Sequence, residues 1–423
     1  MSTVTQDSWM KPDVVVIGGG VVGICTATYL AEAGRRVLLV DRTGVCEETS
    51  SGNAASLAFT DMMPLAQKGM LREVPRWLLD PLGPLSIRPA YLPKLLPWLL
   101  RFARAAHSPG IARCSIDGQA SLMKLAEREW LALARRAGVE AMIRHDGGLE
   151  VYESEAQFRA SLPGWAERDR HGVEYRHLNR AELGDLQPGL SPHFHSGTFL
   201  PGWKTVDDPQ LFSKAVWAYA QSLGAQFRRA TVRAITVAER GVRVTFDGGQ
   251  PIEAELAVIA AGAWSHLLAR LLGDRIPLET ERGYNTTLPA DAFDLKRFIY
   301  FHGHGFVAAQ LSTGLRIGGA VEFGGLDLPP NHARTEAMLK KAVRFLPGLK
   351  TEGGRQWMGY RPSLPDSLPA IGRSTASPRI LYAFGHGHLG LTQAAASGRL
   401  IRDLAIGNAV DLDLAPFRPQ RFM

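Results

Sequence analysis

The most regular pattern of apolar and polar positions lies near the start of the chain. Residues 13–17 form a short β-branched run of the kind that is buried on both faces of a parallel sheet. Residues 21–33 place apolar side chains three and four positions apart, which predicts a helix that ends at Gly34. A second apolar run at 36–41 predicts another strand. Strand, glycine turn, helix and strand in this order indicate a βαβ unit.

Helical and strand patterns also alternate along the rest of the chain. Residues 120–137 have helical periodicity, and Asp208 followed by Pro209 predicts the start of a helix that runs to Gly224. A further helix is predicted at 393–404. Strands are predicted at 147–152, 231–237, 241–246, 256–260, 298–302, 306–310, 315–320 and 379–385. Short turns separate the three runs between 298 and 320, which predicts an antiparallel sheet.

The turn of the βαβ unit carries Gly18, Gly20 and Gly23 in the spacing G-x-G-x-x-G. The first glycine permits a tight turn, the second lets the backbone approach a pyrophosphate, and the third lets the helix pack on the strand. Asp41 ends the second strand 41 − 23 = 18 residues after the last glycine, where a carboxylate suits ribose hydroxyls. These residues predict an adenine-dinucleotide site, against the alternative of a glycine turn without a nucleotide. They do not distinguish FAD from NAD.

Two later segments do not resemble ordinary core elements. Residues 48–56 are small and polar and follow the predicted nucleotide-binding half, so they suit a loop that contacts a ligand; a solvated loop is the alternative. Residues 72–106 mix apolar residues with prolines, which rule out one long helix. Within them, residues 92–106 predict an amphipathic helix with basic residues beside an apolar face. Such a helix suits either a membrane surface or the cover of a substrate domain.

Composition narrows the class of protein. The 423 residues are 45% hydrophobic and 21% charged, which is typical of a globular protein with two or three cores. The formal net charge of +7 is not gathered in a dense Lys/Arg block, so no nucleic acid partner is expected. Cys25, Cys46 and Cys114 lack disulfide or metal-ligand spacing, so no metal site is expected. Residues 1–10 lack signal-peptide features and glycines interrupt the apolar run at 14–31, so we expect a cytoplasmic protein.

Four segments in this order resemble the D-amino-acid oxidase (DAO) superfamily of FAD-dependent oxidoreductases: the N-terminal glycine motif, 258–265, 359–372 and 385–392. Residues 48–54 and the stretch from Arg72 most resemble the bacterial D-amino-acid dehydrogenase small subunit and the D-hydroxyproline dehydrogenase group. The resemblance implies an α/β fold with a discontinuous Rossmann-like FAD-binding domain and a second, α+β substrate domain built on an antiparallel sheet. It places the FAD-binding domain at 11–60, 205–270 and 366–410, and the substrate domain at 61–204 and 271–365.

The resemblance also implies which residues hold the cofactor. The segment 387–392 would meet the flavin at a helix N-terminus, whose free N–H groups stabilise the negative charge of reduced flavin. No cysteine follows Cys114, so non-covalent FAD is expected. The implied cofactor contacts are Gly18, Gly20, Val22, Gly23, Asp41, Arg42, Thr49, Ser50, Asn53, Ala54, Ala55, Val232, Gly262, Trp264, Gly387, Leu389, Gly390, Leu391 and Thr392.

Four side chains are candidates for the substrate site. By the resemblance, Arg361 lies where relatives hold a substrate carboxylate, and its planar fork suits two parallel hydrogen bonds; a surface ion pair is the alternative. Tyr300 and Tyr284 would offer a second donor to the carboxylate, with core packing as the alternative. His388 would border the substrate pocket and tune its charge around neutral pH, whereas His386 is expected to pack structurally.

The predicted reaction is FAD-dependent oxidation of a D-amino acid, with D-proline and hydroxy-D-proline among the candidates. Hydride would pass from Cα to flavin N5, and the imine would hydrolyse to a 2-oxo acid. Electrons would pass to a quinone or another acceptor, through peripheral contact with the inner face of the membrane; oxygen is the rival acceptor. A glycine or sarcosine-type secondary-amine oxidase, an NAD-dependent dehydrogenase and a nucleotide-binding sensor without turnover stay open. The oligomeric state stays open as well, with a homo-oligomer and a complex with other subunits as the alternatives.

Overall fold

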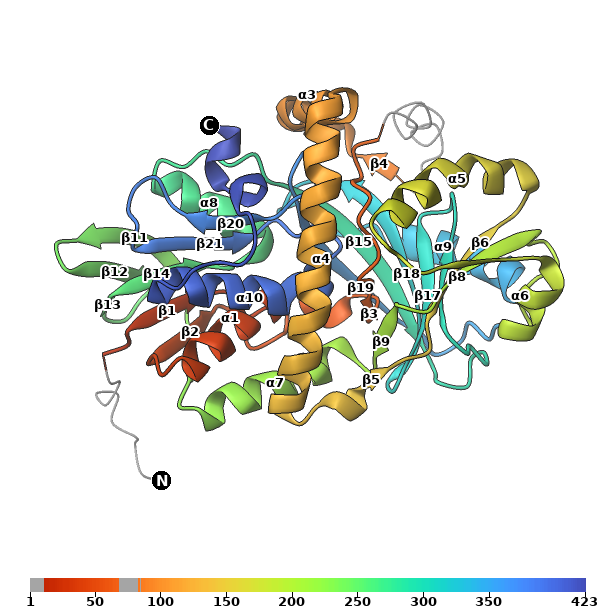
Figure 1. The fold of residues 1–423 in the computed structure, drawn as a ribbon. Helices are drawn as coiled ribbons and strands as arrows, with labels where there is room; N and C mark the ends of the chain where they lie inside the picture. Colours follow the sequence, from red (N-terminus) through yellow and green to blue (C-terminus); the bar gives the residue numbers. More distant parts are fainter. Residues whose placement is uncertain (1–10, 68–82, 84) are drawn as a thin grey trace.

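The computed structural model describes residues 11–67, 83 and 85–423, and two sheets dominate it (Figure 1). The expectations for residues 1–10 and for 72–82 lie outside this described part. The fold has the predicted α/β class. One sheet is largely parallel, as expected for the FAD-binding part, and the other is largely antiparallel, as expected for the substrate part.

The first sheet holds the predicted βαβ unit. Its strand order is β10-β2-β1-β14-β21-β20, and only β20 runs antiparallel to its neighbour. Val14 and Val16 pack on one side with helix α1, whereas Val15 and Ile17 pack on the other, so both faces of β1 are covered. The strands are β1 (Val14–Ile17), β2 (Val37–Asp41), β10 (Gln226–Arg229), β14 (Leu256–Ile259), β20 (Ala370–Arg373) and β21 (Ile380–Phe384). Helices α1 (Val21–Glu32), α7 (Pro209–Ser222) and α10 (Gly390–Ile406) lie along one face, and α8 (Ser265–Leu271) with β11 (Val232–Ala238), β12 (Gly241–Phe246) and β13 (Ile252–Ala254) along the other (Figure 1).

The second sheet has the strand order β19-β15-β18-β17-β16-β6-β8-β7, with β4 beside β18. Strands β16, β17 and β18 pair antiparallel, which confirms the prediction for 298–320, whereas β16 and β6 pair in parallel. The strands are β4 (Leu85–Ile87), β6 (Gly148–Tyr152), β7 (Arg176–Leu178), β8 (Ser196–Leu200), β15 (Glu279–Leu288), β16 (Phe298–Phe301), β17 (Phe306–Leu311), β18 (Gly314–Phe323) and β19 (Arg355–Ser363). Helices α5 (Glu155–Arg170), α6 (Arg180–Leu186) and α9 (Ala333–Phe345) accompany it.

Helix α4 (Pro109–Ala137) crosses between the two halves of the molecule (Figure 1). It begins well before the predicted start at 120. The boundaries proposed from the resemblance put it in the substrate domain, but it packs on the helices of the first sheet, where Trp130 Nε1 donates to Leu391 O at 2.8 Å. The apolar face of α4 is therefore buried against the FAD-binding half.

Helix α3 (Leu92–His107) matches the amphipathic helix predicted at 92–106 and lies beside α4. A small sheet of β3 (Ser56–Leu57), β9 (Lys204–Val206) and β5 (Ile143–Arg144) joins the two halves near the small polar segment. Among the helices of the described residues, none combines the length and the apolar character needed to span a bilayer.

Candidate active site

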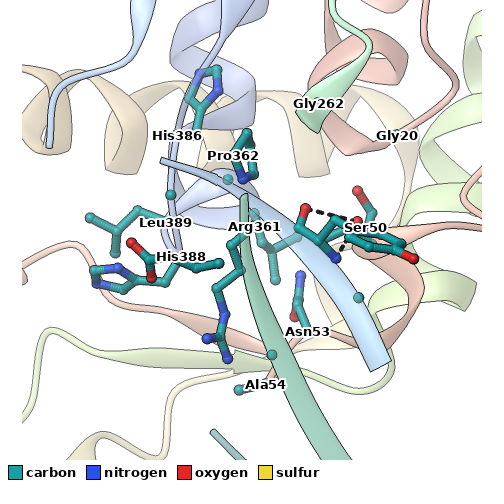
Figure 2. A pocket seen from close by; sticks show the side chains of 18 of the residues that line it. Gly20, Ser50, Asn53, Ala54, Gly262, Arg361, Pro362, His386, His388 and Leu389 are labelled. Carbon is teal, nitrogen blue, oxygen red and sulfur yellow. Dashed lines mark hydrogen bonds between the residues drawn. The ribbon is translucent and has the colours of Figure 1, made fainter. Parts of the chain in front are cut away.

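A cavity of about 970 Å³ is lined by strand ends of the first sheet and by one face of the second (Figure 2). Its volume is at the upper end of the range for small-molecule sites, ~300–1,000 Å³. All the predicted site residues line it except Gly23 and Ala55. Segments that are far apart in the sequence therefore meet around one space.

The glycine motif forms a turn in which side chains would collide with the backbone. A Cβ on Gly18 would lie 2.3 Å from a backbone oxygen just after β14, and one on Gly23 would lie 1.8 Å from Gly18 O. Gly23 therefore lets α1 pack on the strand end. Gly20 is the N-cap of α1, and Ser50 Oγ accepts a hydrogen bond from Val21 N at 3.0 Å. The N-terminus of α1 thus opens on the cavity, as a pyrophosphate site requires.

The Asp41 carboxylate holds this turn in place. Its Oδ2 accepts from Gly19 N at 2.7 Å, and its Oδ1 accepts from Thr43 N at 2.8 Å and from Gly44 N at 3.1 Å. Asp41 also lines the cavity, and Oδ2, which accepts only the bond from Gly19 N, keeps a second lone pair. The contact with ribose hydroxyls stays a prediction, to which the structure adds a role in shaping the turn.

The small polar segment is an ordered loop against the second sheet. The Thr49 hydroxyl donates to Tyr360 O and accepts from Tyr360 N, both at 3.1 Å. Arg316 on β18 donates to Asn53 O at 2.5 Å, and burial lowers the pKa of this arginine to about 10. These bonds hold Asn53 and Ala54 at the cavity wall, which favours a ligand-contacting loop over a solvated one.

Three further predicted cofactor segments meet at another part of the wall. The Arg42 guanidinium lies 3.8 Å from the centroid of the Trp264 ring, which is a cation–π distance. Gly262 begins the short turn after β14 at φ +52, and Val232 begins β11. All four residues line the cavity.

The loop before α10 contributes a second helix N-terminus. Helix α10 begins at Gly390, earlier than predicted, so Gly390, Leu391 and Thr392 form its first turn, whose N–H groups have no partner within the helix. These residues line the cavity. Gly387 has φ +54, and its N–H donates to Pro362 O at 2.8 Å, which ties the loop to β19. Two helix N-termini, a glycine turn and a large cavity fit an anionic dinucleotide such as FAD.

The two histidines of this loop have different surroundings (Figure 2). His386 is buried, its Nε2 lies 2.8 Å from Ser397 Oγ, and burial lowers its pKa to about 3, so it is neutral. His388 Nε2 lies 3.3 Å from Asp61 Oδ2 at the cavity wall. Burial opposes ionisation of Asp61, but His388 and the charge of Arg168 outweigh it and lower the pKa of Asp61.

Arg361 projects into the cavity from the end of β19 (Figure 2). Its guanidinium passes over Gly283, where a Cβ would lie 2.4 Å from Nη2. Nη1 donates to Ala320 O at 2.8 Å and Nη2 to Gly319 O at 3.4 Å. Burial lowers the pKa of Arg361, and the charge of Glu281 opposes that effect. The remaining N–H donors are available to a ligand.

The two candidate tyrosines differ in direction. Tyr300 on β16 is half-buried and lines the cavity, and within the described part of the chain its hydroxyl has no hydrogen-bond partner. Burial and the charges of Glu150 and Asp61 raise its pKa, so it stays a donor. Tyr284 instead turns into the core behind the sheet, where its hydroxyl donates to Glu322 and accepts from a backbone N–H. Tyr284 still lines the cavity, but with these bonds its hydroxyl proton is directed away from it, and the predicted contact with substrate stays a prediction.

Sequence reasoning missed cavity residues that only the strand register brings together. Glu281 on β15 lies directly opposite Arg361 on β19, and His302 Nδ1 lies 2.6 Å from Glu150 Oε1. No local pattern marks these pairs. Other cavity residues that were missed are Asp61, Arg168, Trp203, Asn285, Arg316 and Trp357.

In the part of the chain that the structure describes, no group of three or more His, Cys, Asp or Glu side chains is placed to hold a metal ion.

Comparisons with known proteins agree with this geometry. Residues 13–404 match the family model DAO, FAD dependent oxidoreductase. A D-amino-acid oxidase of Bradyrhizobium diazoefficiens is 36% identical over 97% of this chain and 99% of its own, and a D-amino acid dehydrogenase of Paramagnetospirillum magneticum is 34% identical over 95% and 97%. Glycine oxidase from Geobacillus kaustophilus has the same fold, with a TM-score of 0.73 at 22% identity over 97% and 99% of the two chains. The predicted superfamily, fold class and cofactor are thereby confirmed: the chain belongs to the DAO family of FAD-dependent oxidoreductases.

Proposed function

We propose that this flavoenzyme oxidises D-amino acids and that Arg361 binds the α-carboxylate of the substrate. The observation that carries the proposal is a half-buried guanidinium that faces the cavity with N–H donors left over after its bonds to β18. Charge-assisted bonds from an arginine fork are the strong way to hold a carboxylate. The free hydroxyl of Tyr300 supplies a further donor on the same wall.

The chain's residues position the substrate, and FAD supplies the hydride acceptor when it is bound. A carboxylate held by Arg361 and Tyr300 on the cavity wall fixes the direction of the Cα–H bond. Loss of one proton from the ammonium group and of hydride from Cα gives an iminium, which water converts to a 2-oxo acid and ammonium. The first turn of α10 lines the same cavity and favours negative charge there.

The names of the relatives support this substrate class. Relatives called D-amino-acid oxidase or D-amino acid dehydrogenase align over nearly the whole chain at 29–36% identity. Glycine oxidase and an L-proline dehydrogenase from P. horikoshii, with a TM-score of 0.75 at 20% identity, share the fold. D-proline, hydroxy-D-proline, glycine and sarcosine therefore belong in the same test.

The test is an anaerobic screen for loss of the absorbance of oxidised flavin. The holoenzyme is mixed with D-alanine, D-proline, the hydroxyproline isomers, glycine and sarcosine, with L-alanine as the stereochemical control. The proposal expects D-amino acids to reduce the flavin much faster than L-alanine. Reduction by glycine or sarcosine alone would assign a secondary-amine oxidase, and no reduction by any amine would assign a sensor without turnover.

We further propose that α3 makes peripheral contact with an anionic membrane, where a quinone can accept the electrons. Leu92, Leu96 and Leu100, spaced four residues apart on one side of α3, are 44%, 50% and 65% exposed. The exposed basic residues of the helix are Lys94, Arg101, Arg104 and His107. Apolar side chains flanked by cations suit the headgroup region of an anionic bilayer.

Vesicles test the membrane contact and the acceptor separately. The protein should cosediment with phosphatidylglycerol vesicles more than with phosphatidylcholine vesicles, and Leu96→Asp with Leu100→Asp should abolish binding while flavin reduction by substrate is kept. Equal cosedimentation of the double variant would refute the contact. Mixing the reduced enzyme with oxygen or with a soluble quinone analogue then identifies the acceptor.

A further inference from the structure

Glu281 is a buried carboxylate that the rest of the protein leaves without a partner. It is only 4% exposed and lines the main cavity. Across residues 11–67, 83 and 85–423 its side chain accepts no hydrogen bond and forms no ion pair within 4.0 Å. By contrast, the buried Glu322 on β18 accepts from Arg88 at 2.7 Å and from Tyr284. Buried charges are normally paired, so an unpaired one that faces a cavity points to a ligand.

The register of the sheet puts Glu281 on the same face as Arg361. The two residues lie directly opposite each other on β15 and β19, and opposite residues of an antiparallel pair point to the same side. They nevertheless form no ion pair, because the Arg361 guanidinium turns away over Gly283 towards Ala320. One wall of the cavity therefore presents a cation and an anion that are near each other but not in contact. An amino acid zwitterion carries the complementary pair of charges.

A small side cavity lies behind Glu281. Its volume is about 20 Å³, and Glu281 lines both this space and the main cavity. Gln119 and Ser363 also line it, each 3% exposed, and Gln119 Oε1 and Ser363 Oγ have no hydrogen-bond partner in the described residues. Most of its wall is apolar, but a space larger than about 10–15 Å³ holds one water where polar groups line it, and Gln119, Ser363 and Glu281 supply such groups here.

We propose that Glu281, supported by one water in the side cavity, binds the α-ammonium group of the substrate while Arg361 binds its α-carboxylate. This inference rests on the proposed function, because it needs a carboxylate on Arg361. Glu281 is then the specificity residue that selects amino acids from other carboxylic acids. It attracts the ammonium group of a zwitterion, and it repels a ligand that carries only the carboxylate.

The test compares D-alanine with isobutyrate, in which a methyl group replaces the ammonium group. Binding of each is measured by calorimetry to the holoenzyme reduced with dithionite under anaerobic conditions, so that no oxidation occurs. Glu281→Gln should weaken D-alanine about tenfold or more, as for the loss of a charge-assisted bond, and should leave isobutyrate equally or more tightly bound. A merely structural residue would weaken both ligands together, and that result, or no change, would overturn the proposal.

The matched control is Glu279→Gln. Glu279 is on the same strand, two residues before Glu281, but it accepts a hydrogen bond from Tyr91 at 2.9 Å and lines neither cavity. It should leave both affinities unchanged. The unmodified enzyme gives a second measurement that needs no variant to fold: equal affinity for the two ligands would overturn the role of Glu281 alone, whereas binding of neither would overturn the proposed function as well.

Discussion

The Arg361 guanidinium donates to the Ala320 carbonyl at 2.8 Å, and Ala320 adopts the left-handed conformation at φ +56. The register between β15 and β18 shifts at the same place, as at a β-bulge. A bulge re-aims backbone groups, and this one presents a carbonyl to the arginine and holds it over Gly283. The direction of the Arg361 side chain is therefore set by the backbone of a neighbouring strand.

Arg361→Lys should raise KM for D-amino acids by about 100-fold, because lysine keeps the charge but loses the fork that contacts β18 and substrate together. Arg361→Ala should raise it further. Both variants should keep FAD, which the flavin absorbance of the purified protein reports. Arg243→Lys is the matched control, because Arg243 is an exposed residue paired with Glu253 outside the cavity. An unchanged KM, or loss of FAD, would contradict the assignment.

Gly283→Ala should raise KM about tenfold without loss of FAD, because the new Cβ would lie 2.4 Å from the Arg361 guanidinium and displace it. Gly184→Ala in α6 is the control, since a Cβ there meets nothing within 4 Å. The control should stabilise the fold by about 0.4–1 kcal/mol in urea unfolding. A Gly283→Ala enzyme with normal kinetics would show that the position of the guanidinium does not matter.

Where periodicity is local, the sequence was sufficient to predict the elements. The first βαβ unit follows from an apolar run, a helical stripe and a glycine turn, and the N-cap at Asp208 accepts from Gln210 N and Leu211 N as such a residue should. The first part of α4 was missed because Gly110 and Gly118 lower its helix propensity. Packing overrides that propensity: a Cβ on Gly118 would lie 3.2 Å from a neighbouring proline.

The site could be predicted only where a motif marks it. The glycine turn, the small polar segment and the loop at 385–392 were identified, since each has an unusual composition. Glu281 was not identified, because it lies opposite Arg361 only through the pairing of two strands that are far apart in the sequence. For a related reason, the sequence did not show that the Tyr284 side chain packs in the core of the second sheet. The phase of side-chain alternation is fixed by long-range pairing, which a short window of sequence does not contain.

Asp41→Asn should weaken FAD binding by about 10- to 100-fold. The carboxylate accepts hydrogen bonds from Gly19, Thr43 and Gly44, and an amide in its place would turn an NH₂ group towards one of these donors. The fluorescence of released FAD measures the dissociation constant. Asp291→Asn, at an exposed ion pair with Lys350 outside the cavity, should leave it unchanged. Equal affinity in both variants would mean that the turn does not need its carboxylate.

His386→Asn should make the protein less sensitive to acid. Burial lowers the pKa of His386 from 6.5 to about 3, so between these values the unfolded chain binds a proton that the folded protein does not. Stability contributed by the neutral ring is complete above pH 6.5 and falls by about 1.4 kcal/mol for each pH unit below it. Asparagine does not titrate and keeps a polar group beside Ser397. The variant should therefore lose this part of the pH dependence of the unfolding free energy, which urea unfolding at a series of pH values measures. His145→Asn, at an exposed histidine, should keep the slope of the unmodified protein. If both variants kept it, another group would be responsible for the acid sensitivity.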